Sequence, residues 1–147
     1  MSKPAFEADA LLRDVARLMD ARPEVLEAYL FGSRARGDAQ AHSDVDVAVY
    51  VDAARLPHAP FGYRAAITTD LMAGLGNNRV DVVVLNQAPP LLYHRVLRDG
   101  IRLLSRDLKA TTTREAQALS RYCDYVPQLA KIEAARRGDH QTPTEGT

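Results

Sequence analysis

Two apolar segments near the start of the chain are joined by a link that is too short for most α/β folds. Residues 25–31 form an apolar run interrupted only by Glu27, and residues 44–51 carry valine at every second position. β-Branched residues in strict alternation are typical of a strand with one face in the core. A parallel crossover needs room for a helix and a loop on each side, whereas residues 32–43 hold one or two helical turns beginning at Ser33. We therefore expect an antiparallel or mixed sheet rather than a doubly wound parallel one.

The rest of the chain alternates between helical and strand patterns. Glycine and asparagine end one long helical pattern, and a Pro-Pro pair begins the next. The expected elements are helices ending near 21–23, over 63–75, over 89–98 and over 111–137, and strands over 79–85 and 101–104. Pro127 should kink or split the last helix. This order favours an α/β (α+β) fold, with a small mixed sheet of three to four strands flanked by helices and a helical C-terminal segment.

The strand patterns end near residue 106, which sets the expected domain boundary. Residues 1–106 make one domain, and the chain is long enough to bury a core. Residues 107–137 are expected to form a helical segment that packs on this domain or on a partner. The polar residues 138–147 are expected to be disordered.

The composition excludes several classes of protein. The 147 residues include 19 basic and 19 acidic side chains, so no net charge draws the chain to nucleic acid or to an anionic membrane. Cys123 is the only cysteine, which excludes an internal disulfide, and we expect it in the core or at an interface. The apolar runs are too short to span a bilayer, and the N-terminus lacks the apolar segment of a signal peptide. We expect a cytoplasmic enzyme or binding module that contacts neither nucleic acid nor membrane directly.

A Gly-Ser pair, Gly32 and Ser33, closes the first predicted strand. Glycine lets a ligand approach the backbone closely, and a serine that opens a helix leaves free N–H groups that favour phosphate. Arg34 and Arg36 could add charge-assisted contacts to the same group. The alternative is that Ser33 only caps the helix and that both arginines are solvated.

Three aspartates occupy strand positions. Asp44 and Asp46 are two residues apart, so both side chains point to one face and repel each other unless a cation lies between them. Carboxylate oxygens suit Mg²⁺, which binds one or two carboxylates plus substrate phosphates. Asp81 begins a strand otherwise built of valine, and it can lie beside Asp46 if the two strands pair. Three carboxylates could then hold two metal ions and activate an attacking hydroxyl.

Each aspartate also has a simpler interpretation. Asp44 and Asp46 could be solvated near a strand end, and Asp81 could pair with Arg79. His42, which precedes these carboxylates, is expected to face solvent. The joint pattern favours a catalytic site, because the Gly-Ser and Asp-x-Asp pairs fall at the strand end and strand start that phosphate and metal chemistry need.

The Gly-Ser pair, the ten residues after it and the Asp-x-Asp pair resemble the signature of the polymerase-β-like nucleotidyltransferase superfamily. The wider string, Phe31 to Asp38 and then Ser43 to Asp46, is similar to that of its minimal nucleotidyltransferases (MNTs). These small proteins are commonly the antitoxins of HEPN-domain ribonuclease toxins. The resemblance covers residues 5–106 and implies a nucleotidyltransferase fold for them.

The resemblance implies a role for each matching residue. Gly32 and Ser33 would hold the triphosphate of ATP. Asp44 and Asp46 would bind Mg²⁺, with two ions expected, and Asp81 would be the third carboxylate, a metal ligand and candidate base. Arg34 and Arg36 match the family string and are candidate nucleotide-binding residues.

The resemblance also implies a reaction and a partner. The chain would transfer AMP from ATP to a hydroxyl, expected to be a tyrosine, of a cognate HEPN toxin, and would neutralise the toxin within a hetero-oligomer. Little chain remains to build an acceptor pocket, which favours a protein that brings its own hydroxyl. Two alternatives stay open. One is an adenylyltransferase for a small molecule such as an aminoglycoside, and the other is a non-catalytic antitoxin that binds through an apolar stripe around Leu119, Val126 and Ala130.

Overall fold

The computed structural model describes residues 3–39 and 43–141, so His42 lies outside the described residues. The helices are α1 (Lys3–Asp20), α2 (Ser33–Arg36), α3 (Tyr63–Leu75), α4 (Pro90–Asp99) and α5 (Leu108–Gln141), with short 3₁₀ turns at Ala53–Arg55 and Leu85–Gln87. The strands are β1 (Val25–Phe31), β2 (Val45–Val51), β3 (Val80–Val84) and β4 (Ile101–Ser105). The predicted elements are confirmed to within a few residues at each boundary.

The four strands form one mixed sheet in the order β3-β2-β1-β4. β1 is antiparallel to both β2 and β4, whereas β2 and β3 are parallel. The short link through α2 therefore joins an antiparallel pair, and the longer link through α3 makes the parallel crossover. The expectation of a small mixed sheet flanked by helices is confirmed.

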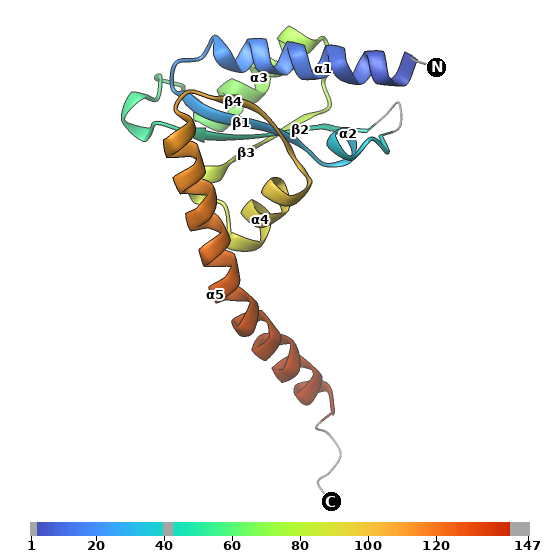
Figure 1. Cartoon of the computed structure of the whole chain (residues 1–147), viewed down its shortest axis with the longest axis vertical. Coiled ribbons are helices and arrows are strands. Elements are labelled where there is room, and N and C mark those ends of the chain that lie inside the picture. Colours follow the sequence, from blue (N-terminus) through green and yellow to red (C-terminus); the bar gives the residue numbers. More distant parts are fainter. Residues whose placement is uncertain (1–2, 40–42, 142–147) are drawn as a thin grey trace, which may run out of the picture.

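Alternation along β2 sends its side chains into two different cores. The valines from Val45 to Val51 pack against α1 and α3, with Val15 and Ile67 among the residues they contact. On the other face, Ala48 packs with residues of α4 and α5. Figure 1 shows this layering, with α1 and α3 on one side of the sheet and α4 and α5 on the other. Each fully buried valine adds about 1.5–3 kcal/mol of transfer free energy, so both layers are fixed to the sheet.

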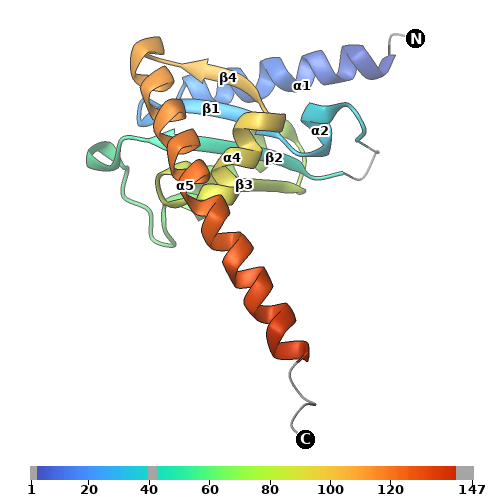
Figure 2. The same ribbon diagram turned by 60° about the horizontal axis from the view of Figure 1, so that its bottom comes forward.

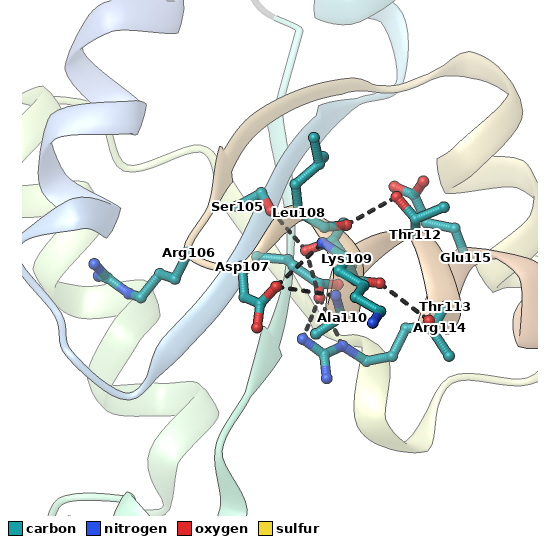
Figure 3. Close-up of polar contacts among 12 residues, drawn as sticks. Ser105, Arg106, Asp107, Leu108, Lys109, Ala110, Thr112, Thr113, Arg114 and Glu115 are labelled. Atoms are coloured by element: carbon teal, nitrogen blue, oxygen red, sulfur yellow. Dashed lines mark hydrogen bonds and ion pairs between the residues drawn. The ribbon is translucent and has the colours of Figure 1, made fainter.

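A bulge in β1 places a charged residue in the core. The register between β1 and β2 shifts between Val25 and Glu27, and the Glu27 side chain is 0% exposed. Its carboxylate accepts hydrogen bonds from Thr111 Oγ1 at 2.9 Å and Arg114 Nε at 2.6 Å, both on α5. Asp107 caps the same helix by accepting from the backbone N–H groups of Lys109 and Ala110 (Figure 3). The first turns of α5 are thus bound to the sheet by a buried ion pair.

The second half of α5 leaves the domain and projects away from it in both views (Figures 1 and 2). Pro127 lies inside the helix and does not split it. The proline costs one backbone hydrogen bond, and water can satisfy the freed carbonyl because this part of the helix is exposed. Cys123 is exposed, so the prediction of a core position is wrong and an interface position stays a prediction. No helix in the described part of the chain is both long and apolar enough to cross a bilayer.

Candidate active site

The parallel pairing of β2 and β3 brings two of the predicted carboxylates side by side. Asp46 and Asp81 are direct partners in the register, so both side chains lie on the sheet face that carries α4. Asp44 lies just before β2 and is exposed. The predicted proximity of Asp81 to Asp46 is confirmed.

The surroundings of Asp46 disfavour the ionised form of its carboxyl group. Partial burial raises the pKa of Asp46 above its ordinary value, and the negative charges of Asp81 and Asp44 raise it further. The guanidinium of Arg36 acts in the opposite direction without cancelling them. This end of the sheet therefore carries excess negative charge, the condition under which a bound cation is stabilised.

Gly32 forms a tight turn between β1 and α2, directly against this carboxylate. Phe31 pairs with Asp46 in the sheet, and Gly32 follows with φ +75°. A Cβ atom at Gly32 would lie 2.2 Å from Oδ2 of Asp46. Glycine is therefore needed here for two reasons, the left-handed backbone and the close approach of the turn to the aspartate.

A cleft of about 440 Å³ opens at this end of the sheet. Its lining residues are Phe31, Gly32, Ser33, Arg36, Ser43, Asp44, Asp46, Arg95 and Asp99. The structure thus brings five of the seven predicted site residues into one cleft and leaves Arg34 and Asp81 outside its lining. The backbone turn and the two carboxylates beside it can accommodate a phosphate chain with its counter-cation.

The two predicted arginines have different surroundings. Arg34 donates from Nη2 to the backbone carbonyl of Ser43 at 3.0 Å, which ties α2 to the segment that precedes β2. Arg36 lines the cleft and pairs with Asp38 at 3.4 Å, with both side chains about half exposed. Arg34 therefore supports the shape of the cleft, and Arg36 is the one placed to reach a ligand in it.

Asp81 faces a second cavity that adjoins the cleft. This cavity has a volume of about 740 Å³ and is lined mainly by apolar side chains, among them Leu56, Val83 and Leu92. Arg64 pairs with Asp81 at 3.1 Å, and its Nε also donates to the carbonyl of Val82 at 2.7 Å. Asp81 thus pairs with Arg64 of α3 and not with Arg79, the partner considered from the sequence.

The donor set of the cleft fits a hard divalent cation, although it does not form a closed metal site. Asp44 and Asp46 offer the carboxylate oxygens that Mg²⁺ prefers, with excess negative charge around them. Within residues 3–39 and 43–141, no group of three His, Cys, Asp or Glu side chains is arranged to hold a metal ion. A cation bound here would therefore complete its coordination with ligand oxygens and water, as Mg²⁺ commonly does in nucleotide sites.

Two cleft residues, Arg95 and Asp99, come from α4 and were not predicted from the sequence. A hydrogen bond from Arg98 lowers the pKa of Asp99, and the nearby cations Arg36 and Arg95 lower it further. A four-residue spacing on a helix is too common to single out such residues. Only the packing of α4 against the sheet brings them to the cleft.

The comparison with protein-family models adds an independent finding. Residues 13–109 match the family model described as Polymerase beta, Nucleotidyltransferase. The chain belongs to this nucleotidyltransferase family. The match spans the sheet, α2 and the cleft, so the cleft lies in the nucleotidyltransferase domain.

Solved structures of toxin–antitoxin complexes share the fold of the nucleotidyltransferase. A chain of a toxin–antitoxin crystal structure with AMP-PNP is 24% identical, with a TM-score of 0.69 over 85% of this chain and 98% of that one. A chain from the complex of a tri-AMPylated Shewanella oneidensis HEPN toxin with its MNT antitoxin is 21% identical, with a TM-score of 0.65 and coverage of 88% and 98%. A mutant MntA–HepT complex contains a chain that is 25% identical, with a TM-score of 0.66 and coverage of 84% and 96%.

The comparison with curated protein sequences gives no significant match. The family and the MNT-type fold predicted from the sequence motifs are confirmed by the family model and the shared structures. The roles of the individual site residues stay predictions.

Proposed function

We propose that this nucleotidyltransferase is an MNT antitoxin that transfers AMP from ATP to a tyrosine hydroxyl of a cognate HEPN ribonuclease toxin, with which it forms a hetero-oligomer. The observation that carries the proposal is the cleft in which the Gly32–Ser33 turn faces Asp44 and Asp46. The structural neighbours support it, since one is a complex with AMP-PNP and another contains a tri-AMPylated HEPN toxin.

In this proposal, different residues of the cleft bind the triphosphate of ATP and its metal ion. The backbone N–H groups of the Gly32–Ser33 turn and the Arg36 guanidinium bind the triphosphate. Asp44 and Asp46 would hold Mg²⁺, with Asp81 as a candidate third ligand. Bound there, the ion would supply positive charge to the phosphates and polarise the attacking oxygen.

Asp81 would act on the acceptor side. Its carboxylate faces the apolar cavity beside the cleft, and Arg64 fixes its position through the ion pair at 3.1 Å. An aromatic hydroxyl in this cavity would present its oxygen to Asp81, which would accept the proton as the oxygen attacks the α-phosphorus. The cavity is open, which suits an acceptor carried by a docked protein.

The test is transfer to the product of the adjacent reading frame. The wild-type chain, Mg²⁺ and ATP are mixed with that protein, and its intact mass is measured. We expect a mass gain of one or more AMP units, which disappears with Asp44→Asn combined with Asp46→Asn. The matched control is Asp9→Asn combined with Asp14→Asn, which removes two carboxylates from α1 on the opposite face of the sheet and should transfer normally.

The outcomes separate the remaining alternatives. Transfer that survives the loss of Asp44 and Asp46 would refute the site. Neutralisation of the partner by that double variant without AMP on the partner would favour an antitoxin that acts by binding alone. AMP found on an aminoglycoside and never on the partner would favour the small-molecule enzyme.

A further inference from the structure

One cationic side chain lies at the boundary between the nucleotide cleft and the apolar cavity. Arg95 lines both of them, as does Phe31. The cleft contains Ser33 and Asp46 on one side of this boundary, and the cavity contains Asp81 on the other. Arg95 therefore lies where a ligand in the cleft would adjoin a ligand in the cavity.

The spacing of residues along α4 explains this position. Leu92, Arg95 and Asp99 lie at i, i+3 and i+7, so they share one face of the helix. Leu92 lines the apolar cavity, Asp99 lines the cleft, and Arg95 lines both. The buried residues Tyr93 and Val96 fix the helix to the sheet beside this face.

Arg95 differs from the other two arginines at these surfaces because it forms no close ion pair with the described residues, although its charge helps to lower the pKa of Asp99 from a greater distance. Arg36 pairs with Asp38 and Arg64 pairs with Asp81. Within residues 3–39 and 43–141, no carboxylate lies within ion-pair distance of the Arg95 guanidinium. An exposed guanidinium without a carboxylate partner, at the edge of a phosphate-sized cleft, is suited to a phosphoryl group.

We propose that Arg95 is a catalytic residue that binds the phosphoryl group under transfer, at the boundary between nucleotide and acceptor. This inference rests on the proposed AMP transfer. The acceptor oxygen forms a bond to the α-phosphorus, and the bond from that phosphorus to the oxygen bridging to the β-phosphorus breaks. The electron pair leaves with pyrophosphate, and the hydroxyl proton goes to Asp81. In-line displacement places the transferred phosphorus between the leaving and attacking oxygens, which is where Arg95 lies.

The charge of Arg95 should matter more in the transition state than in the nucleotide complex. Arg36 and the Gly32–Ser33 turn hold the triphosphate inside the cleft, so they govern nucleotide affinity. Arg95 would contact the equatorial phosphoryl oxygens as negative charge is redistributed during transfer. A positioned donor of this kind typically contributes about 10²–10³-fold to the rate of the chemical step.

The experiment measures nucleotide binding and chemistry separately. Binding is followed with Mg²⁺ and α,β-methylene-ATP, whose α–β bond cannot be cleaved, and transfer is followed as a single turnover to the adjacent-frame protein. For Arg95→Gln we expect a rate lower by roughly 10²–10³-fold, with analogue affinity within about threefold of wild type. Arg95→Lys should recover part of the rate, and ethylguanidinium added to Arg95→Ala should recover part of it as well. Arg13→Gln, which removes an exposed arginine on the opposite face of the sheet, is the matched control.

The results distinguish this inference from the function on which it rests. Wild-type transfer together with an unchanged rate for Arg95→Gln overturns the role of Arg95 alone. A loss of analogue affinity that accounts for the whole rate loss also overturns it, since Arg95 would then only bind the ground state. A wild-type chain that transfers no AMP overturns the proposed function and the role of Arg95 with it.

Discussion

At the scale of single residues, the ionised carboxylate of Asp46 destabilises the folded chain. Its pKa in the folded chain is raised above the ordinary value by burial and by the charges of Asp81 and Asp44. Between the unfolded and folded pKa values the folded chain binds more protons, so stability falls as pH rises through that window. At pH 7 the cost of the ionised carboxylate is fully present. This is the expected cost of a site whose charge is matched only when a cation binds.

Asp46→Asn should therefore stabilise the chain in metal-free buffer at pH 7. The expected gain is up to about 1 kcal/mol, the scale of adjacent like charges in a sheet, or a rise in Tm of roughly 2–4 °C. Thermal unfolding with a chelator measures it, with Asp9→Asn as the control for a lost surface charge. The advantage should shrink as pH falls toward the carboxyl range, and a Tm below wild type at every pH would contradict the account.

Gly32→Ala should be more damaging than the same change at Gly37. Both glycines have positive φ, +75° and +83°, but a Cβ at Gly32 meets Asp46 at 2.2 Å whereas a Cβ at Gly37 meets nothing within 4 Å. An alanine in either positive-φ conformation costs about 1–3 kcal/mol, and the clash with Asp46 adds to this cost only at Gly32. Urea unfolding and binding of Mg²⁺–α,β-methylene-ATP compare the two variants. Equal stability losses with intact binding in both would show that the turn does not depend on this close approach.

At the scale of elements, one buried ion pair joins α5 to the sheet. Glu27 is fully buried on β1, and Arg114 on α5 binds it while lying 4.6 Å from the ring centroid of Tyr50. Removing one partner leaves a buried charge, so Arg114→Met should cost about 3–5 kcal/mol in urea unfolding. Arg102→Gln breaks the more exposed pair with Glu115 and should cost less than about 1 kcal/mol.

A double variant checks the physical cause of that loss. Glu27→Met combined with Arg114→Met removes both charges, so it should lose less stability than Arg114→Met alone. If the double variant instead loses more stability than Arg114→Met alone, the loss comes from the packing of the two side chains and not from an uncompensated charge.

The elements that could be predicted from sequence are those with a strong local pattern. The valine alternation of β2 and the short link between β1 and β2 were sufficient to predict a mixed sheet. The proximity of Asp46 to Asp81 was expected only if their strands pair, and the structure supplies that pairing. The bulge at Glu27 was not predictable, because a glutamate in an apolar run gives no sign of the Arg114 partner far along the chain. Arg95 and Asp99 were missed for a similar reason, since only tertiary packing brings their helix face to the cleft.

At the scale of the whole molecule, the chain has a compact nucleotidyltransferase domain and a helix that extends beyond it (Figure 2). The inner part of α5 contacts α4, where Tyr122 stacks on His94 with ring centroids 3.6 Å apart. Farther along α5, Val126 and Ile132 are 41% and 44% exposed. The boundary predicted near residue 106 stays a prediction. The stability of shortened chains would show how much of α5 the domain needs.

Ending the chain after Asp124 should leave the domain folded. The ion pair of Arg114 and the stack of Tyr122 on His94 are both kept, so the free energy of unfolding should stay within about 0.5 kcal/mol of the full chain. A chain that ends after Asp107 loses both contacts and should be strongly destabilised. Thermal unfolding with and without Mg²⁺–α,β-methylene-ATP measures the two. A folding defect in the longer truncation would place the distal half of α5 within the domain.

The proposed reaction is transfer of AMP to a partner protein by the cleft that contains the Gly32–Ser33 turn, Asp44 and Asp46. It is tested most directly with Mg²⁺ and ATP labelled at either the α- or the γ-phosphate, mixed with the chain and the product of its adjacent reading frame. We expect the partner to take up the α label and not the γ label, and the Asp44→Asn, Asp46→Asn variant to transfer neither. Uptake of the γ label, or uptake of the α label by that variant, would contradict the proposed reaction.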